Sequence, residues 1–277
     1  MAQLVDFSQI FIGSFMTASK FTKVDMDVIR PAVLNVLRLY RTKFVSEYGE
    51  LILCCDDRKS WRKELYPNYK ASRKKTRSAA PIDWDDLYEY LNIFKEELIE
   101  WFPYKVLQTE KAEADDIIAV LVGLANERTL ILSSDKDFIQ LHQFNVRQYS
   151  PMQKKFVEGD AKWNLHEKIV KGDVGDGVPN IMSDDNVFVD EGRRQKPITK
   201  KKVDAWYDLD PEMYCDSEML RNYNRNKQLV DLSEVPESIR INITKQFETT
   251  AVGDRKRLLT YFINNRLKNL TESLGEF

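Results

Sequence analysis

The sequence predicts an α/β protein with a mostly parallel central sheet, flanking helices and a smaller helical region toward the C-terminus. Over the first two thirds of the chain, short apolar runs alternate with amphipathic stretches, which is the pattern of parallel α/β folds. Beyond about residue 180, strand-like runs become rare and apolar residues recur at helical spacing. We therefore expect one domain over residues 1–180 and a helical domain over residues 181–277.

The expected elements of the first domain follow from local patterns. We expect a short strand at Leu4–Phe7, a helix over residues 25–44 and a strand buried on both faces at Leu51–Cys55, where the chain is continuously apolar. A second helix should begin after Asp83, which suits an N-cap, and end at Pro103. It is followed by a helix over residues 113–126 and a strand over residues 129–132.

The second domain is expected to contain a loop and then helices. Residues 181–200 are polar and charged, as a loop would be. The last expected helix begins after Asp254, and its apolar stripe consists of Leu259, Ile263, Leu267, Leu270 and Leu274.

Composition excludes several classes of protein. No apolar run approaches the ~18 residues that a membrane span needs, and the N-terminus lacks the regions of a signal peptide. Three cysteines, two of them adjacent, give no disulfide framework and indicate a reducing compartment such as the cytoplasm. Only His142 and His166 are available, which argues against zinc chemistry and against a histidine-based triad.

Carboxylates cluster where apolar strands end or helices begin, which is the main functional pattern of the chain. Ligands bind beyond the carboxyl ends of strands in open α/β sheets, so these side chains should converge there. Crowded carboxylates need a positive partner, and hard oxygen ligands select Mg²⁺ or Mn²⁺. The sequence thus predicts a metal-dependent phosphoryl-transfer enzyme. The clustered carboxylates are Asp6, Asp56, Asp57, Glu113, Asp115, Asp116, Asp135, Asp137, Asp173 and Asp176.

Two basic stretches are separate from the acids, although the net charge is −2. Residues 58–77 contain nine Lys or Arg and a single acid, Glu64, with Trp61, Tyr66 and Tyr69 interleaved. Aromatic rings among cations suit single-stranded nucleic acid, where bases stack and phosphates pair with the charges. The expected phosphate-contacting residues are Arg62, Lys63, Lys74, Lys75 and Arg77, with Arg193, Arg194, Lys196, Lys200, Lys201 and Lys202 from the second stretch.

The order of these motifs resembles the structure-specific 5′-nuclease (flap endonuclease) family, whose central domain has a PIN-like 5′-nuclease fold. Residues Tyr66-Pro67-Asn68-Tyr69-Lys70-Ala71-Ser72-Arg73 resemble the family's arch motif, of the form YPxYKxxR. The stretches 148–155 and 270–277 are similar to phage members. The resemblance runs nearly end to end and places an arch at about residues 58–80.

The resemblance implies a two-metal nuclease that uses Mg²⁺, with Mn²⁺ as a substitute. The first ion would be surrounded by Asp6, Asp56, Glu113, Asp115 and Asp135. The second would be held, partly through water, by Asp137, Asp173 and Asp176, while Asp57 and Asp116 would orient ligands. Lys70 and Arg73 would act at the scissile phosphate, and Tyr69 would stack on a base.

By the same resemblance, the enzyme would be a 5′→3′ exonuclease and flap endonuclease that removes RNA primers and adjacent DNA during lagging-strand replication. Its substrates would be DNA and RNA–DNA hybrids with 5′ ends or flaps. Its suggested partners are a single-stranded-DNA-binding protein and a sliding clamp. We expect a monomer in the host cytoplasm, with no membrane partner. The family's glycine-rich duplex clamp is missing after Asp176, so the basic stretch 193–202 is expected to serve the duplex.

Two other readings of the residues remain open at this point. A PIN-type single-strand ribonuclease also gathers acids over a parallel sheet, but it would lack the basic arch and the helical C-terminal region. A non-catalytic DNA-binding replisome protein would not need the complete acid set.

Overall fold

The computed structural model describes residues 2–73, 77, 82–125 and 127–277. Its centre is a six-stranded sheet in the order β3-β2-β1-β4-β5-β6, in which only the β5–β6 pair is antiparallel. This confirms the predicted α/β class with a mostly parallel sheet. The strands are β1 (Ala2–Asp6), β2 (Leu51–Cys54), β3 (Lys105–Leu107), β4 (Thr129–Leu132), β5 (Val146–Ser150) and β6 (Lys155–Val157).

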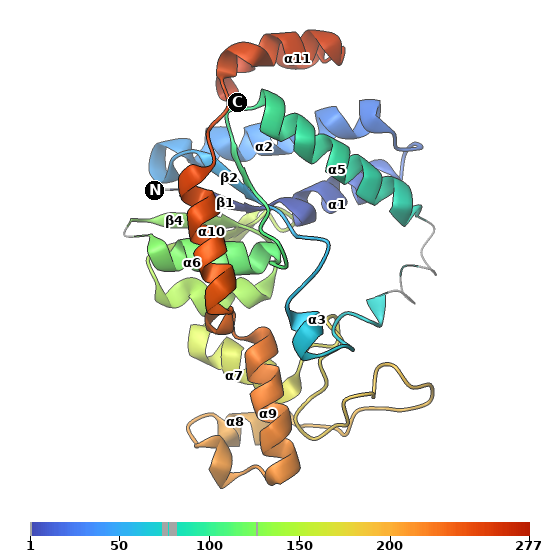
Figure 1. Ribbon diagram of the computed structural model, residues 1–277, viewed down its shortest axis with the longest axis vertical. Helices are drawn as coiled ribbons and strands as arrows, with labels where there is room; N and C mark the ends of the chain where they lie inside the picture. The colour runs from blue at the N-terminus through green and yellow to red at the C-terminus, as the bar shows by residue number, and fades with distance from the viewer. Residues whose placement is uncertain (1, 74–76, 78–81, 126) are drawn as a thin grey trace.

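Helices cover both faces of the sheet, because successive residues of the buried strands point to opposite sides. Val5 of β1 packs with the helices on one face, and its neighbour Leu4 packs with those on the other. Figure 1 shows the first group beside one face of the sheet and α6 beside the other. The first group is α1 (Phe7–Ala18), α2 (Met26–Tyr48) and α5 (Trp84–Trp101), and the second is α6 (Ala114–Leu124) with α10 (Glu237–Thr249).

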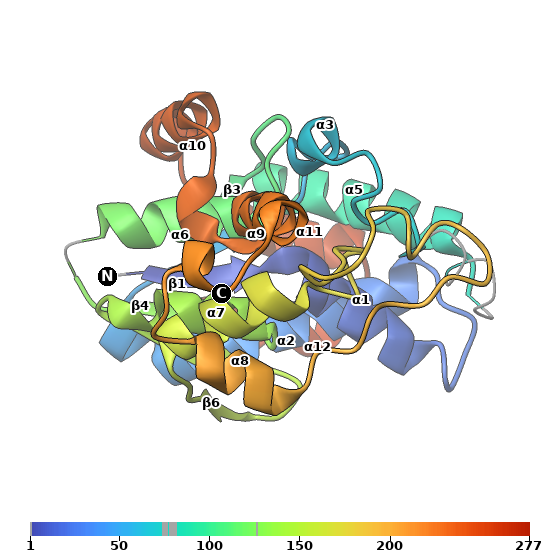
Figure 2. The ribbon, with the colours of Figure 1, turned by 90° about the horizontal axis from the view of Figure 1, so that it is seen from below.

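The C-terminal part of the chain is helical, as predicted. Residues 181–199 form no helix or strand and project as a long loop on the side where α3 lies (Figures 1 and 2). Tyr66 and Asn68 both donate hydrogen bonds to the carbonyl oxygen of Asp185, which ties this loop to the region after α3. The remaining helices are α3 (Arg62–Leu65), α7 (Ala161–Lys171), α8 (Lys200–Trp206), α9 (Ser217–Val230), α11 (Leu258–Asn264) and α12 (Lys268–Thr271).

The described residues also contain short 3-10 helices. They are η1 (Lys136–Gln143), η2 (Pro211–Met213), η3 (Leu232–Glu234), η4 (Arg255–Arg257) and η5 (Leu274–Glu276). Across the described residues, no helix is both long and apolar enough to cross a bilayer.

Two local predictions differ from the structure. The strand expected to reach Phe7 ends at Asp6, because Asp6 instead caps α1 by accepting a hydrogen bond from the Gln9 backbone amide at 3.1 Å. The single helix expected after Asp254 is broken into η4, α11 and α12, with Arg266 in the left-handed region at φ +57°.

The apolar stripe predicted for that segment is confirmed at Leu267 and Leu270, which are buried, but it is wrong at its first two positions. Leu259 and Ile263 are exposed, whereas Leu258 and Phe262, one residue earlier in each case, are buried. This segment contains two apolar stripes with the same spacing. The stripe with Leu258 and Phe262 is the buried one, because Phe262 packs against Phe102 in the aromatic cluster. In this way the end of the chain packs onto α2 and α5, at the opposite end of the molecule from α8 and α9 (Figure 1).

Candidate active site

The sequence-predicted acids come together at the carboxyl ends of the strands, beginning with Asp6. The last residue of β1 is Asp6, which stands in register with Cys54 of β2, while Val5 pairs with Leu132 of β4. Asp6 accepts a hydrogen bond from the Ser133 hydroxyl at 3.0 Å, just beyond β4. Strand register therefore fixes where this first carboxylate lies.

Asp56 and Asp135 follow the neighbouring strands. Asp56 accepts a hydrogen bond from the backbone amide of Ala114 at 2.9 Å, so the end of β2 is joined to the first turn of α6. Asp135 caps η1 by accepting from the Asp137 amide at 3.0 Å. In both cases a backbone donor orients one oxygen of the carboxylate.

Asp6, Asp56, Asp135 and Asp115, which lies in the first turn of α6, form a first group of acids whose charges affect one another. Burial, followed by the charge of Asp56, raises the pKa of Asp6 to about 7. Burial raises the pKa of Asp115 well above its usual range, and the charges of Asp135 and Asp6 add to the effect. Carboxylates that raise each other's pKa need a cation to ionise together. This donor set suits a divalent ion with oxygen ligands.

A second group of acids already has an internal cation. The Lys168 ammonium lies 2.6 Å from Oδ1 of Asp137 and also donates to Oδ2 of Asp173. Burial and then the charge of Asp135 raise the pKa of Asp137 to about 7 in spite of Lys168. For Asp173, burial acts upward, but Lys168 outweighs it and the pKa is lowered. No sequence pattern selects Lys168, a lysine in the last turn of an ordinary amphipathic helix.

The arch residues contact Glu113 and Asp176, the remaining two of the eight predicted metal ligands. Lys70 donates to Oε1 of Glu113 at 2.6 Å, and Arg73 pairs with Asp176. The Tyr69 hydroxyl lies 2.8 Å from Glu113 and 2.9 Å from Asp176, so its single proton is within hydrogen-bonding reach of both carboxylates. Burial alone would raise the pKa of Glu113, but Lys70 and Arg62 lower it. The arch motif and the acids thus form one connected cluster.

Backbone geometry brings the arch to this position. Lys70 lies in the left-handed region at φ +57°, and its amide donates to the Asp176 carbonyl at 2.7 Å. Gly177 has φ +69°, and a Cβ there would lie 3.2 Å from the carbonyl oxygen of Asn68. The last acidic motif and the arch therefore approach each other through their backbones, where a glycine leaves the necessary room.

Arg62 does not lie where a phosphate-contacting residue would lie. Its side chain is 2% exposed, and its guanidinium spans both oxygens of Asp116, with distances of 2.8 and 3.0 Å. It also contacts Glu113 at 3.2 Å and donates to the Leu229 carbonyl at 2.8 Å. Arg62 is thus a buried counter-ion that joins α3, α6 and the end of α9.

The aromatic side chains of the arch are buried in this structure as well. Trp61, Tyr66 and Tyr69 are each less than a tenth exposed. Trp61 donates to Asp116 at 3.0 Å, and Tyr69 binds the acids described above. None of these three rings presents a free face, so the expectation that they stack on bases does not describe this conformation.

Asp57 and Asp116 hold the loops that carry the other acids. Asp57 accepts from the Lys111 amide at 2.8 Å and from the Gln108 side chain at 3.4 Å. Asp116 accepts from the Glu113 amide at 2.9 Å, which fixes the start of α6. Both carboxylates thus hold backbone or side-chain groups in the segment from Gln108 to Glu113.

The other predicted phosphate contacts are spread over two areas. Lys63 is exposed, and Arg77 stacks on the rings of Trp84 and Tyr88. Arg193 pairs with acids of its own loop, Asp184 and Asp190. Lys74 and Lys75 lie outside the described residues. Arg194, Lys196, Lys200, Lys201 and Lys202 are exposed.

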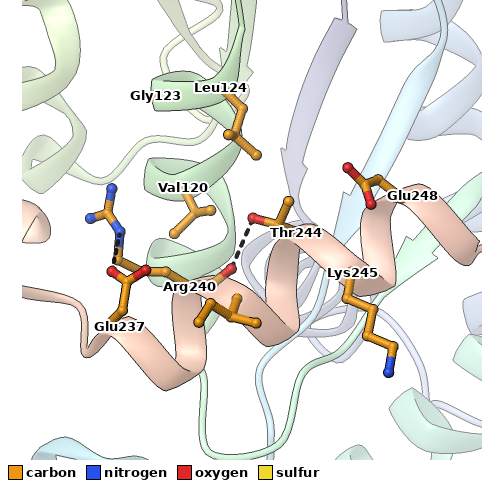
Figure 3. A pocket seen from close by; sticks show the side chains of 9 residues that line it. Val120, Gly123, Leu124, Glu237, Arg240, Thr244, Lys245 and Glu248 are labelled. Carbon is orange, nitrogen blue, oxygen red and sulfur yellow. Dashed lines mark hydrogen bonds and ion pairs between the residues drawn. The ribbon is translucent and has the colours of Figure 1, made fainter.

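As the side chains stand, the described Asp, Glu, His and Cys residues contain no group of three placed to hold a metal ion. Lys70, Arg73 and Lys168 instead contact several of the acids. A groove of about 470 Å³ lies elsewhere, between α6 and α10 (Figure 3). Its lining, which includes Val120, Leu124 and Arg240, contains none of the sequence-predicted residues. The candidate site is therefore the acid cluster at the sheet edge.

Fold and site together define a nuclease of the 5′-3′ exonuclease class. Residues 2–170 match the family model of the 5′-3′ exonuclease N-terminal resolvase-like domain, and residues 159–277 match that of the T4 RNase H C-terminal region. The chain belongs to the 5′-3′ exonuclease family, and it is an enzyme that hydrolyses phosphodiester bonds. This sets aside the non-catalytic reading and the PIN-type ribonuclease.

Within this family, the chain is similar over nearly its whole length to ribonuclease H of Enterobacteria phage T4. The two are 34% identical over 99% of this chain and 95% of the relative. Flap endonuclease Xni of Shewanella baltica is 29% identical over 55% of this chain and 58% of its own length. The sequence-based resemblance to flap endonucleases, and to phage members in particular, is thereby confirmed.

Solved structures confirm the fold. A bacteriophage T5 flap endonuclease variant in complex with DNA and metal ions has a TM-score of 0.65, at 18% identity, covering 89% of this chain and 98% of that one. The T5 5′-exonuclease with bound zinc has a TM-score of 0.64, at 17% identity, covering 90% and 99%.

Proposed function

We propose that this nuclease is a Mg²⁺-dependent 5′→3′ exonuclease and flap endonuclease that removes RNA primers and adjacent DNA during lagging-strand replication. The observation that carries the proposal is the first group of acids. Asp6, Asp56 and Asp135 lie at or just after the ends of adjacent strands at one edge of the sheet. Burial, with neighbouring carboxylates, raises the pKa of Asp6 and Asp115. The relatives are named for ribonuclease H and flap endonuclease activity, which fits this substrate range.

The acids fit a two-ion site in which Mn²⁺ substitutes for Mg²⁺. We assign Asp6, Asp56, Glu113, Asp115 and Asp135 to the first ion, and Asp137, Asp173 and Asp176 to the second, partly through water. Divalent ions bound there supply positive charge that activates water and neutralises the phosphate in the transition state. The bound zinc described for the T5 5′-exonuclease supports a divalent site in this fold.

The chain's own cations complete the proposed mechanism. Lys70 and Arg73 reach Glu113 and Asp176 from the arch, so their charges already lie at the acid cluster. We propose that they turn to the non-bridging phosphate oxygens when substrate is bound, where negative charge develops. Asp57 and Asp116 position the loops that carry the ligands. The side chains need no histidine base for this chemistry.

Substrate selection would be structural, since phosphate contacts carry no sequence information. The arch would demand a free or fraying 5′ end, and the exposed lysines of residues 196–202 would bind duplex phosphates. We propose that residues 1–180 and 181–277 divide these roles between them. A monomer that acts with a single-stranded-DNA-binding protein and a sliding clamp, in the cytoplasm of a host cell, would fit a replication role.

The decisive experiment compares wild type with Asp135→Asn on a 5′-labelled RNA–DNA flap, with and without Mg²⁺. We expect cleavage only with Mg²⁺, and its loss in Asp135→Asn while DNA binding is largely kept. Asp216→Asn is the matched control, because Asp216 caps α9 through the Met219 amide and asparagine caps equally well. Full activity of Asp135→Asn, or cleavage without a divalent ion, would refute the proposal.

A further inference from the structure

Lys168 stands out because it is shared between two predicted ligands of one ion. Its ammonium lies 2.6 Å from Asp137 and still closer to Asp173, which come from η1 and from the loop after α7. Both carboxylates are about one fifth exposed and the lysine is 24% exposed. An ammonium in this position reduces the electrostatic repulsion between the two carboxylates.

The first group of acids contrasts with this pair. Among the described residues, no lysine or arginine forms an ion pair with Asp6, Asp56, Asp115 or Asp135. Within the described part of the chain, these four carboxylates are therefore without an ion-paired cation, and among the five acids assigned to the first ion only Glu113 is paired, with Lys70 and Arg62. A divalent ion that binds between the four displaces no ammonium from them, but one that binds between Asp137 and Asp173 must displace Lys168 from both.

We propose that Lys168 is an internal counter-ion that occupies the Asp137–Asp173 pair until a divalent ion displaces it, so that the two ions bind with unequal affinity. The inference rests on the proposed function, because it concerns the second ion of that site. Lys168 would then be a positioning residue: it keeps Asp137 and Asp173 together in the ion-free enzyme and withdraws toward solvent when the ion binds.

The expected effect is a change in the affinity of one ion only. A unit positive charge that must leave the site, or remain beside a divalent ion, weakens the binding of that ion by about tenfold or more at protein-surface dielectric values. Replacing Lys168 with a neutral side chain should therefore tighten the weaker class of ion by about tenfold and leave the tighter class unchanged.

The test is a titration with Mn²⁺ alone, in which the free ion is followed by electron paramagnetic resonance. Wild type should show two unequal classes of bound ion. Lys168→Met and Lys168→Gln should tighten the weaker class, whereas Lys168→Arg, which keeps the charge, should resemble wild type. Lys171→Met is the matched control, because Lys171 lies in the same helical turn but pairs with Glu167 at 2.7 Å. The glutamine variant keeps hydrogen bonding to the carboxylates, which protects the fold if the methionine variant is unstable.

The outcomes separate the inference from the function on which it rests. A weaker class that is unchanged or weakened in folded Lys168→Met and Lys168→Gln overturns the counter-ion role, while Mn²⁺ binding by wild type leaves the proposed nuclease intact. Absence of any Mn²⁺ binding by wild type overturns the metal-dependent function, and the inference falls with it.

Discussion

The buried ion pair between Arg62 and Asp116 gives the sharpest stability prediction. The guanidinium is 2% exposed and the carboxylate is fully buried, with two contacts of 2.8 and 3.0 Å between them. Removing one partner of a buried pair leaves an uncompensated charge and costs roughly 3–5 kcal/mol. Because folded domains are stable by only about 5–15 kcal/mol, we expect Arg62→Met to remove a large share of the total.

An exposed pair in the same chain supplies the comparison. Arg128 and Glu47 are 2.9 Å apart, but their side chains are 55% and 46% exposed. Exposed pairs contribute about 0–1 kcal/mol, because water screens the charges. Arg128→Met should therefore change the free energy of unfolding by less than about 1 kcal/mol.

The assay is equilibrium urea denaturation followed by circular dichroism, with EDTA in all samples so that metal binding adds nothing. A cycle of Arg62→Met, Asp116→Asn and the double variant measures the coupling directly. The double variant should cost less than the sum of the single variants, because neither charge is then left alone. If Arg62→Met is no more destabilising than Arg128→Met, the buried counter-ion role is wrong.

The same variant tests the role that the sequence predicted for Arg62. When a residue that contacts phosphate is removed, the slope of log affinity for DNA against log salt concentration falls in magnitude by about one unit. A buried counter-ion does not. Under conditions where Arg62→Met is folded, we expect the slope to match that of wild type.

Three further predictions concern the acid cluster and the arch. Mg²⁺ should raise the melting temperature more at pH 8 than at pH 6. Because the pKa of Asp6 is about 7, this carboxyl is mostly protonated at pH 6, and the proton lowers the affinity for the ion by about tenfold. An equal shift of the melting temperature at both pH values would contradict this. Lys70→Ala should slow single-turnover flap cleavage by about 100-fold, while duplex affinity measured by fluorescence anisotropy changes little. Equal losses of cleavage rate and duplex affinity would show that Lys70 is a general phosphate contact. Gly177→Ala should lower the free energy of unfolding, measured by urea denaturation, by about 1–2 kcal/mol. The reason is that its φ of +69° suits glycine and that a Cβ would approach the Asn68 carbonyl. An unchanged free energy would show that the backbone adjusts freely.

The parts of the structure that the sequence predicted are those fixed by local pattern. Leu51–Cys54 forms a strand because every residue is apolar, and Asp83 caps α5 because its side chain accepts from two amides of the first turn. The convergence of Asp6, Asp56 and Asp135 follows from one topological fact, since parallel strands have their carboxyl ends at a common edge. No long-range information was needed beyond the alternation of strands and helices.

The parts that were missed depend on partners far away in the sequence. Arg62 belongs to a strongly basic segment, but its environment is set by Asp116, 54 residues later, and by Leu229, 167 residues later. Composition gives the charge of a segment without telling which of its cations point inward. The same holds for the last helices, where Phe102 in the first part of the chain decides which of two apolar stripes is buried.

The inward-pointing cations explain how so many carboxylates can lie in one place in a folded chain. Arg62 neutralises Asp116, Lys70 neutralises Glu113, and Lys168 lies between Asp137 and Asp173. Most pKa values follow this division, because Glu113 and Asp173 have lowered values while Asp6 and Asp115, without such a partner among the described residues, have raised ones. Asp137 departs from it, since burial and the charge of Asp135 raise its pKa to about 7 in spite of Lys168. Folding thus compensates most of the cluster with its own side chains. The uncompensated remainder is the group around Asp6 and Asp115, and a divalent ion bound there would supply the positive charge that these carboxylates lack.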